Sequence, residues 1–182
     1  MAVPSFAAFL RGINVSGHRV AGGELRSCFA GLGFERVATL RASGNVVFDA
    51  ERGRPADLTA GIEEALESAL GYAVPTFLRT AAEVRAIVRH RPFDDELVEA
   101  SGGKLQVSFL RRPPTARLRK EVLAMATDED RLAIRGRELY WLPSGRMLDA
   151  TIDLVALERA IGPTTRRTKN VIEEIAAKHF SG

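Results

Sequence analysis

A stretch near the N-terminus gathers groups that could bind an anion. It reads Leu10-Arg11-Gly12-Ile13-Asn14-Val15-Ser16-Gly17-His18-Arg19. Glycines leave backbone amides open to a ligand, and Arg11 adds a fixed positive charge. The spacing Gly12-x-x-x-x-Gly17 approaches a phosphate-binding P-loop, but His18 and Arg19 replace the lysine and the hydroxyl residue of that motif. The stretch therefore predicts either an anion-binding loop without nucleotide hydrolysis, or a structural turn whose glycines satisfy backbone geometry.

A second polar turn, Ala42-Ser43-Gly44-Asn45, follows a later strand. Asn14 and Asn45 are both typical of turns, because the asparagine side chain bonds nearby backbone groups. Ser43 has no Gly-x-Ser-x-Gly elbow around it and no identifiable His–Asp pair, so a serine nucleophile is not predicted. Our hypothesis is that the two turns lie close together and form one site.

Other charged groups carry weaker signals. His18, His90 and His179 are far apart in the sequence, so no metal site is predicted and no cofactor is expected. The acidic runs at residues 94–96 and 128–130 predict solvated loops.

Two basic clusters lie in the second half of the chain, at residues 111–120 and 166–169. Solvated charge is the first interpretation of both. A phosphate contact is the alternative at 166–169, because a helix is expected to begin directly after it. Neither cluster is interleaved with aromatic residues, and the net charge is only +3, so a nucleic-acid partner has weak support.

Hydrophobic periodicity places these groups on elements. In the first half, the order is strand, helix, strand, strand, helix, strand, with the strands at 5–10, 36–41, 45–49 and 74–79 and the helices at 23–32 and 58–70. Gly33 is expected to end the first helix and Gly71 the second, and Asp57 to cap the second. This order is that of a ferredoxin-like unit, an antiparallel sheet with both helices on one face.

The second half repeats this order less completely. Thr80 and Glu83 form a capping box for a connecting helix at 81–91, which a loop at 92–103 follows. The remaining expectations are strands at 104–110, 131–135 and 138–142, helices that begin at Pro113-Pro114 and at Thr151, an extended segment at 164–168, and a C-terminal helix at 170–180. We therefore predict an α+β fold of two tandem ferredoxin-like units, 1–80 and 81–182, with antiparallel sheets.

Composition sets broad limits. The 182 residues are 46% hydrophobic and 27% charged, which is ordinary for a globular protein, and no stretch approaches the ~20 apolar residues of a membrane span. No signal peptide is recognised, so we expect a cytoplasmic protein without a membrane partner. The single cysteine, Cys28, lies on the apolar stripe of its helix, which predicts a buried and inert thiol.

Several of these motifs resemble the domain of unknown function 1697 (DUF1697), a family of small bacterial proteins. The resemblance is carried by Leu10 to Gly17, Leu25-Arg26, Gly33-Phe34, Ser43-Gly44-Asn45-Val46-Val47-Phe48, Arg91-Pro92-Phe93 and Thr164-Thr165-Arg166. It implies a fold of two ferredoxin-like units and no established activity. It also implies a shared set of candidate site positions, Arg11, Gly12, Asn14, Ser43, Gly44, Asn45 and Arg166. The chain departs from the pattern at His18, Arg167 and Asn170, where lysine, asparagine and threonine are usual.

Three hypotheses for function follow. The first is a binding module in which the turns at 11–19 and 42–45 converge with Arg166 on a small anionic ligand or a nucleic-acid phosphate. The second is an enzyme that acts on a phosphorylated or carboxylated small molecule, with His18 as its one candidate base. The third is structural, with Arg11 and Arg166 bonding carbonyls at the interface between the halves. Oligomeric state does not follow from the sequence.

Overall fold

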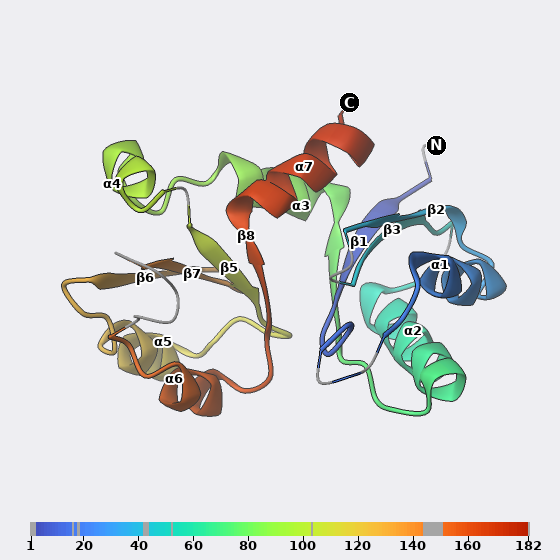
Figure 1. The fold of residues 1–182 in the computed structure, drawn as a ribbon, viewed down its shortest axis with the longest axis horizontal. Coiled ribbons are helices and arrows are strands. Elements are labelled where there is room, and N and C mark those ends of the chain that lie inside the picture. The colour runs from blue at the N-terminus through green and yellow to red at the C-terminus, as the bar shows by residue number, and fades with distance from the viewer. Residues whose placement is uncertain are drawn as a thin grey trace. The chain divides into compact units, whose positions relative to one another are not determined.

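The computed structural model describes residues 3–181 except for 16, 18, 42, 43, 52, 103 and 144–150. Its elements form two compact units. One contains the residues up to Ile87 and those from Ile175 onward, and the other is Val88–Glu174. Each unit holds a four-stranded antiparallel sheet (Figure 1). The predicted α+β fold of two ferredoxin-like units is therefore confirmed.

The first unit arranges its sheet in the order β2-β3-β1-β4. The strands are β1 (Ser5–Leu10), β2 (Glu35–Leu40), β3 (Asn45–Asp49) and β4 (Thr76–Thr80). Helices α1 (Gly22–Gly31) and α2 (Pro55–Leu70) lie together on one face of this sheet (Figure 1). Because the strands are antiparallel, β1 and β2 finish at the same end of the sheet as β4 begins. The predicted loops emerge from this end.

Helix α2 shows how the sequence builds this layer. Leu58, Ile62 and Leu66 recur every four residues and are all buried in the core of the first unit. The prediction that Asp57 caps this helix is wrong, because the helix begins earlier, at Pro55, whose fixed φ suits the first helical position. Asp57 instead pairs with Arg54, with Nε and Oδ2 2.8 Å apart.

The second unit repeats the topology, with the sheet order β6-β7-β5-β8. Its strands are β5 (Gln106–Phe109), β6 (Asp130–Arg135), β7 (Glu138–Pro143) and β8 (Thr165–Thr168), and its sheet helices are α5 (Ala116–Leu123) and α6 (Leu154–Ile161). Gly136 turns the β6–β7 hairpin with a φ of 58°. The short strand β8 completes the unit where an extended segment was expected.

The starts of α5 and α6 differ from the predictions by a few residues. Helix α5 begins at Ala116 rather than at the two prolines, because Thr115 Oγ1 accepts a hydrogen bond from Leu118 N and so caps it. Helix α6 begins after Asp153, which accepts from Ala156 N, rather than at Thr151. In both cases a capping side chain sets the boundary.

Three further helices complete the chain: α3 (Ala81–Arg89), α4 (Asp95–Ala100) and α7 (Lys169–His179). The capping box of α3 is confirmed, with Thr80 N donating to Glu83 Oε2 at 2.8 Å and Glu83 N donating to Thr80 Oγ1 at 3.2 Å. The prediction of a continuous loop at 92–103 is wrong. Helix α4 lies within it, and because none of its residues is buried it leaves no apolar stripe in the sequence. Among the described residues no helix is long and apolar enough to cross a membrane.

Candidate functional site

The two predicted turns lie against each other in the first unit. Leu10 N donates to Gly44 O at 2.8 Å, and Arg11 N donates to Pro75 O at 2.9 Å. A Cβ atom on Gly44 would come within 3.0 Å of side-chain atoms of Leu10 and Ile13. The first loop thus rests directly on the backbone of the second turn, and only glycine leaves room for this approach.

The sign of φ alternates along the first loop. Gly12 and Asn14 have φ values of 80° and 57°, and Ile13 between them has an ordinary negative φ. Such alternation is typical of backbone turns whose successive N–H groups face one side, an arrangement that suits an anion. The N–H groups of Gly12 and Ile13 make no hydrogen bond within the described part of the chain.

Asparagine side chains hold both turns in shape. Val20 N donates to Asn14 Oδ1 at 2.7 Å, and Asn14 Nδ2 donates to Val20 O at 3.3 Å, so one amide closes the loop. In the second turn, the buried Asn45 donates from Nδ2 to Leu40 O at 3.0 Å. Both asparagines therefore hold the backbone of their turns in place.

Both turns carry arginines. Arg11 is half-buried, while Arg19 and Arg41 are exposed. No aspartate or glutamate occurs between residues 11 and 23 or between 36 and 48. His18 and Ser43, two further candidates, lie outside the described residues.

Arg166, the remaining candidate, belongs to β8 of the second unit. Its guanidinium carbon lies 5.0 Å from the centre of the Trp141 ring, and burial lowers its pKa while Glu158 raises it. Its Nη1 is buried and has no hydrogen-bond partner in the described structure. The adjoining cavity has a volume of about 20 Å³, room for one water molecule. Arg166 is thus placed to bind water or a very small group rather than an extended ligand.

The neighbouring basic residues are not solvated. Arg167 and Lys169 are only 8% and 6% exposed, so the interpretation of 166–169 as solvated charge is wrong. Burial lowers the pKa of Arg167 to about 10. By contrast, the basic side chains at 111–120 are exposed, as expected.

The prediction of a solvated acidic loop at 128–130 is wrong for Asp130. It is 1% exposed, not part of a solvated acidic loop, and it accepts hydrogen bonds from Trp141 and from Thr151 and Ile152. Its spacing within the β6 strand pattern, two residues before Leu132 and four before Ile134, was the one signal that it faces the core.

A third polar cluster sits at a β-bulge in the first unit. The register of β2 shifts between Glu35 and Ala38, and Arg36 there takes a φ of 47°. Its Nε bonds the carboxylate of Asp49, which also accepts from Ser5 Oγ at 2.6 Å. Asp49 is buried. The bulge directs Arg36 toward this carboxylate, and the ion pair joins the outer strand β2 to β3.

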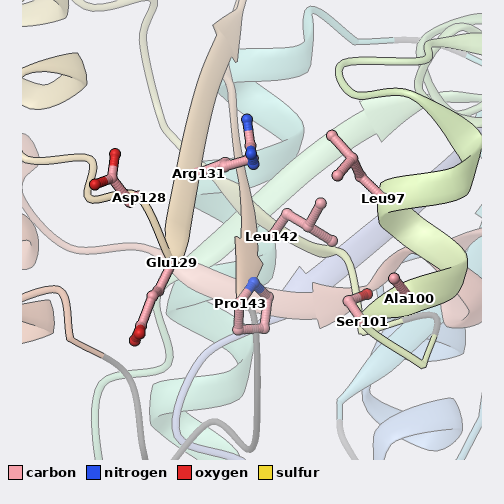
Figure 2. Close-up of a pocket in the computed structure, with 8 residues that line it drawn as sticks. All are labelled: Leu97, Ala100, Ser101, Asp128, Glu129, Arg131, Leu142 and Pro143. Carbon is pink, nitrogen blue, oxygen red and sulfur yellow. The ribbon is translucent and has the colours of Figure 1, made fainter.

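Figure 2 shows a cavity of about 170 Å³ at the edge of the second sheet, beside α4. Leu97 of α4 and Leu142 of β7 line it, and the carboxylates of Asp128 and Glu129 point away from α4 in this view. No predicted site residue lines this cavity. Its polar lining residues are Ser101, Asp128, Glu129 and Arg131.

Metal and thiol chemistry have little basis in the described residues. No group of three histidine, cysteine or acidic side chains there could hold a metal ion. Cys28 is partly buried, and burial, followed by Glu24, raises the pKa of its thiol. A thiol with a raised pKa is a poor nucleophile at neutral pH.

Comparison with known proteins shows where the chain belongs. No curated relative matches the sequence. The chain is similar in structure to the conserved bacterial protein SP0830 from Streptococcus pneumoniae, with a TM-score of 0.74, 19% identity, and coverage of 97% of this chain and 98% of that one. This likeness is one of fold. A family model described as a protein of unknown function (DUF1697) matches residues 3–140. The chain is therefore a member of the DUF1697 family.

Proposed function

We propose that the loop from Arg11 to Val20 is a binding site for a small anion, such as the phosphate or carboxylate group of a small molecule. One observation carries the proposal. Gly12 and Asn14 are left-handed on either side of Ile13, and the N–H groups of Gly12 and Ile13 have no partner in the described chain. Binding of an anion to a backbone turn of this kind is favourable, because the anion accepts hydrogen bonds from the unpaired N–H groups.

Charge and rigidity support the same proposal. The turns themselves carry arginines and no carboxylates, which favours an anionic ligand. The bonds from Asn14 to Val20 and the contact of Gly44 with Ile13 hold the loop in this shape before a ligand arrives. Preorganisation of this kind lowers the entropic cost of binding. A single strand of nucleic acid is a weaker candidate, because no exposed aromatic residue lies in either turn to stack on a base.

A matched pair of glycine variants tests the proposal. Gly12 and Gly33 both have a φ of 80° and both have open space where a Cβ would lie. Alanine at either position costs about 1 kcal/mol in backbone strain, so the two variants should lose similar stability. Only Gly12→Ala disturbs the proposed binding loop. Isothermal titration of the full chain with inorganic phosphate and a nucleoside monophosphate should show about tenfold weaker binding for Gly12→Ala and wild-type binding for Gly33→Ala.

Arginine variants separate charge from backbone. Arg11→Met should also weaken binding, whereas Arg112→Met, an exposed arginine of the second unit, should leave it unchanged. Absence of binding to the wild-type chain, or equal binding by Gly12→Ala and Gly33→Ala, would overturn the proposal. In that event the structural hypothesis for the loop would be preferred, and Arg11→Met would lower the melting temperature instead. Tighter binding of an oligonucleotide than of the small anions would favour a nucleic-acid partner.

A further inference from the structure

A stretch that carries the family resemblance meets the start of α7 at one cavity of the second unit. Arg91-Pro92-Phe93 precedes α4, and Lys169-Asn170 begins α7 directly after the 164–166 motif. All five residues line the same cavity, which has a volume of about 290 Å³. This is near the lower limit of the range for small-molecule sites, about 300 Å³. The proposed anion loop belongs to the other unit and contributes nothing to this cavity.

Lys169 supplies a buried positive charge to this cavity. Lys169 is 6% exposed, and its Nζ donates to His90 O at 2.7 Å. An ammonium group has three donors, and in the part of the chain described here Nζ makes this one hydrogen bond. Burial, and then Arg91, lower the pKa of Lys169, while Glu173 and Asp95 raise it. A buried ammonium with unused donors favours an anionic group of a ligand.

Glu173 supplies a negative charge one helical turn away. It lies four residues after Lys169 on α7, so both side chains project from one side of the helix. Such spacing normally allows an ion pair, yet none forms between these two residues, and Glu173 makes no hydrogen bond among the described residues. Asp95 differs, because its carboxylate pairs with Arg91, with Nε and Oδ1 3.5 Å apart.

Apolar side chains form the rest of the wall. Phe93 and Val98 are half-buried and Leu105 is 2% exposed. The cavity therefore offers the buried cation of Lys169, the unpaired carboxylate of Glu173 and an apolar surface, while its other charged lining residues, Arg91, Asp95 and Glu99, are exposed. From this combination we infer that it binds a small zwitterion, a free α-amino acid with an apolar side chain, whose carboxylate bonds Lys169 and whose ammonium group bonds Glu173.

The direction of α7 agrees with this orientation. The helix spans Lys169–His179, so its N-terminus, where backbone N–H groups and the positive end of the dipole lie, is at the Lys169 side of the cavity. Lys169 N itself is used, since it donates to Leu105 O at 2.8 Å. A carboxylate near Lys169 gains from the dipole, and an ammonium group is better placed one turn further along, beside Glu173.

Titration of the full chain with three probes tests the inference. The probes are L-leucine, isocaproate, which lacks the ammonium group, and isoamylamine, which lacks the carboxylate. We expect L-leucine to shift the amide NMR signals of Phe93, Leu105 and Glu173, with a Kd of about 1 mM or below. Each of the other probes should bind about tenfold more weakly. Equal binding of either analogue, or tighter binding of inorganic phosphate at the same residues, would overturn the zwitterion assignment.

Substitutions of Lys169 and Glu173 test which group of the ligand each residue binds. Lys169→Met and Glu173→Gln should each weaken L-leucine binding about tenfold, and Glu173→Gln should remove the preference over isocaproate. Lys120→Met, on the exposed face of α5, and Glu174→Gln, which adjoins Glu173 outside the cavity lining, serve as controls and should bind like the wild type. Lys169 also holds His90 O, so its variant can lose stability. The glutamate variant and the probe series decide the question in that case, and wild-type affinity of Glu173→Gln would overturn the inference.

Discussion

The indole Nε1 of Trp141 donates a 2.7 Å hydrogen bond to Oδ1 of Asp130, a carboxylate that is 1% exposed. The other oxygen, Oδ2, accepts from Thr151 N at 2.6 Å, from Thr151 Oγ1 at 2.7 Å and from Ile152 N at 3.2 Å. One buried side chain therefore ties β6 and β7 to the segment before α6. A buried carboxylate of this kind stabilises the fold only while its oxygens accept these hydrogen bonds.

Replacement of this carboxylate by an amide should destabilise the second unit. Asp130→Asn puts an NH2 group against donors that it cannot satisfy, and we expect a loss of about 2–4 kcal/mol in the free energy of unfolding. Trp141 is the only tryptophan, so its fluorescence in a urea titration reports the change directly. Asp128→Asn, at an exposed neighbour, is the control and should change the stability by less than about 0.5 kcal/mol.

The same carboxylate should make stability depend on acid. Burial raises the pKa of Asp130, but the hydrogen bonds from Thr151, Trp141 and Ile152 outweigh it and hold this pKa below the usual value. A folded-state pKa below the unfolded one adds stability above about pH 4, and this stability is lost as the pH falls through the folded-state pKa. Unfolding of the wild type should therefore become easier below about pH 4. Asp130→Asn should show a shallower dependence in this range, and identical slopes would contradict the assignment.

Contact between the two turns of the first unit should make Gly44 intolerant of a side chain. Gly44 has a φ of 71°, and a Cβ there would lie 3.0 Å from buried Leu10 and Ile13. Backbone strain and overpacking together predict a loss of about 2–4 kcal/mol for Gly44→Ala. Gly71→Ala has a similar φ of 78° and open space, so thermal unfolding should show only the strain, about 1 kcal/mol. Equal losses of stability for Gly44→Ala and Gly71→Ala would mean that the loop and the turn shift and make room for the added methyl group.

Arg166 should contribute little to stability. Its buried Nη1 lacks a partner, which costs free energy and offsets the attraction of the guanidinium to Trp141. Arg166→Met keeps a flexible apolar chain against the indole, so denaturation should show a change of less than about 1 kcal/mol. Arg167→Met is the matched comparison. Arg167 Nη1 donates to Thr165 Oγ1 and to Arg166 O, and its loss should cost about 1–3 kcal/mol. A large loss for Arg166→Met would instead favour a structural role for this arginine.

Much of the fold could be predicted because it depends on local patterns. The leucine and isoleucine spacing of α2, the capping box of α3 and the glycine of the β6–β7 turn act within a few residues of chain. Helix α4 could not be predicted in this way. It is short and exposed, and it has no buried residue to mark its face.

The candidate site divides along the same line. The sequence alone determined that glycine, asparagine and arginine gather in two turns after strands, and the proximity of those turns was a hypothesis. The tertiary structure decided that Gly44 admits no side chain beside Ile13. This contact joins residues that are distant in the chain, which no local pattern encodes.

Burial of charge is where sequence and structure diverged most. Local sequence shows that Asp130, Arg167 and Lys169 are charged, and charge alone predicts a solvated surface. Asp130 on β6, Arg167 on β8 and Lys169 on α7 are buried in the second unit, where Trp141, Thr165 and His90 supply partners 2.7 to 2.9 Å away. The free energy of a charged group depends on its surroundings, and only the tertiary structure sets those surroundings. The sequence by itself therefore determined the order of the strands and of the helices other than α4, and the folded chain decided which charges are buried against partners or face a cavity.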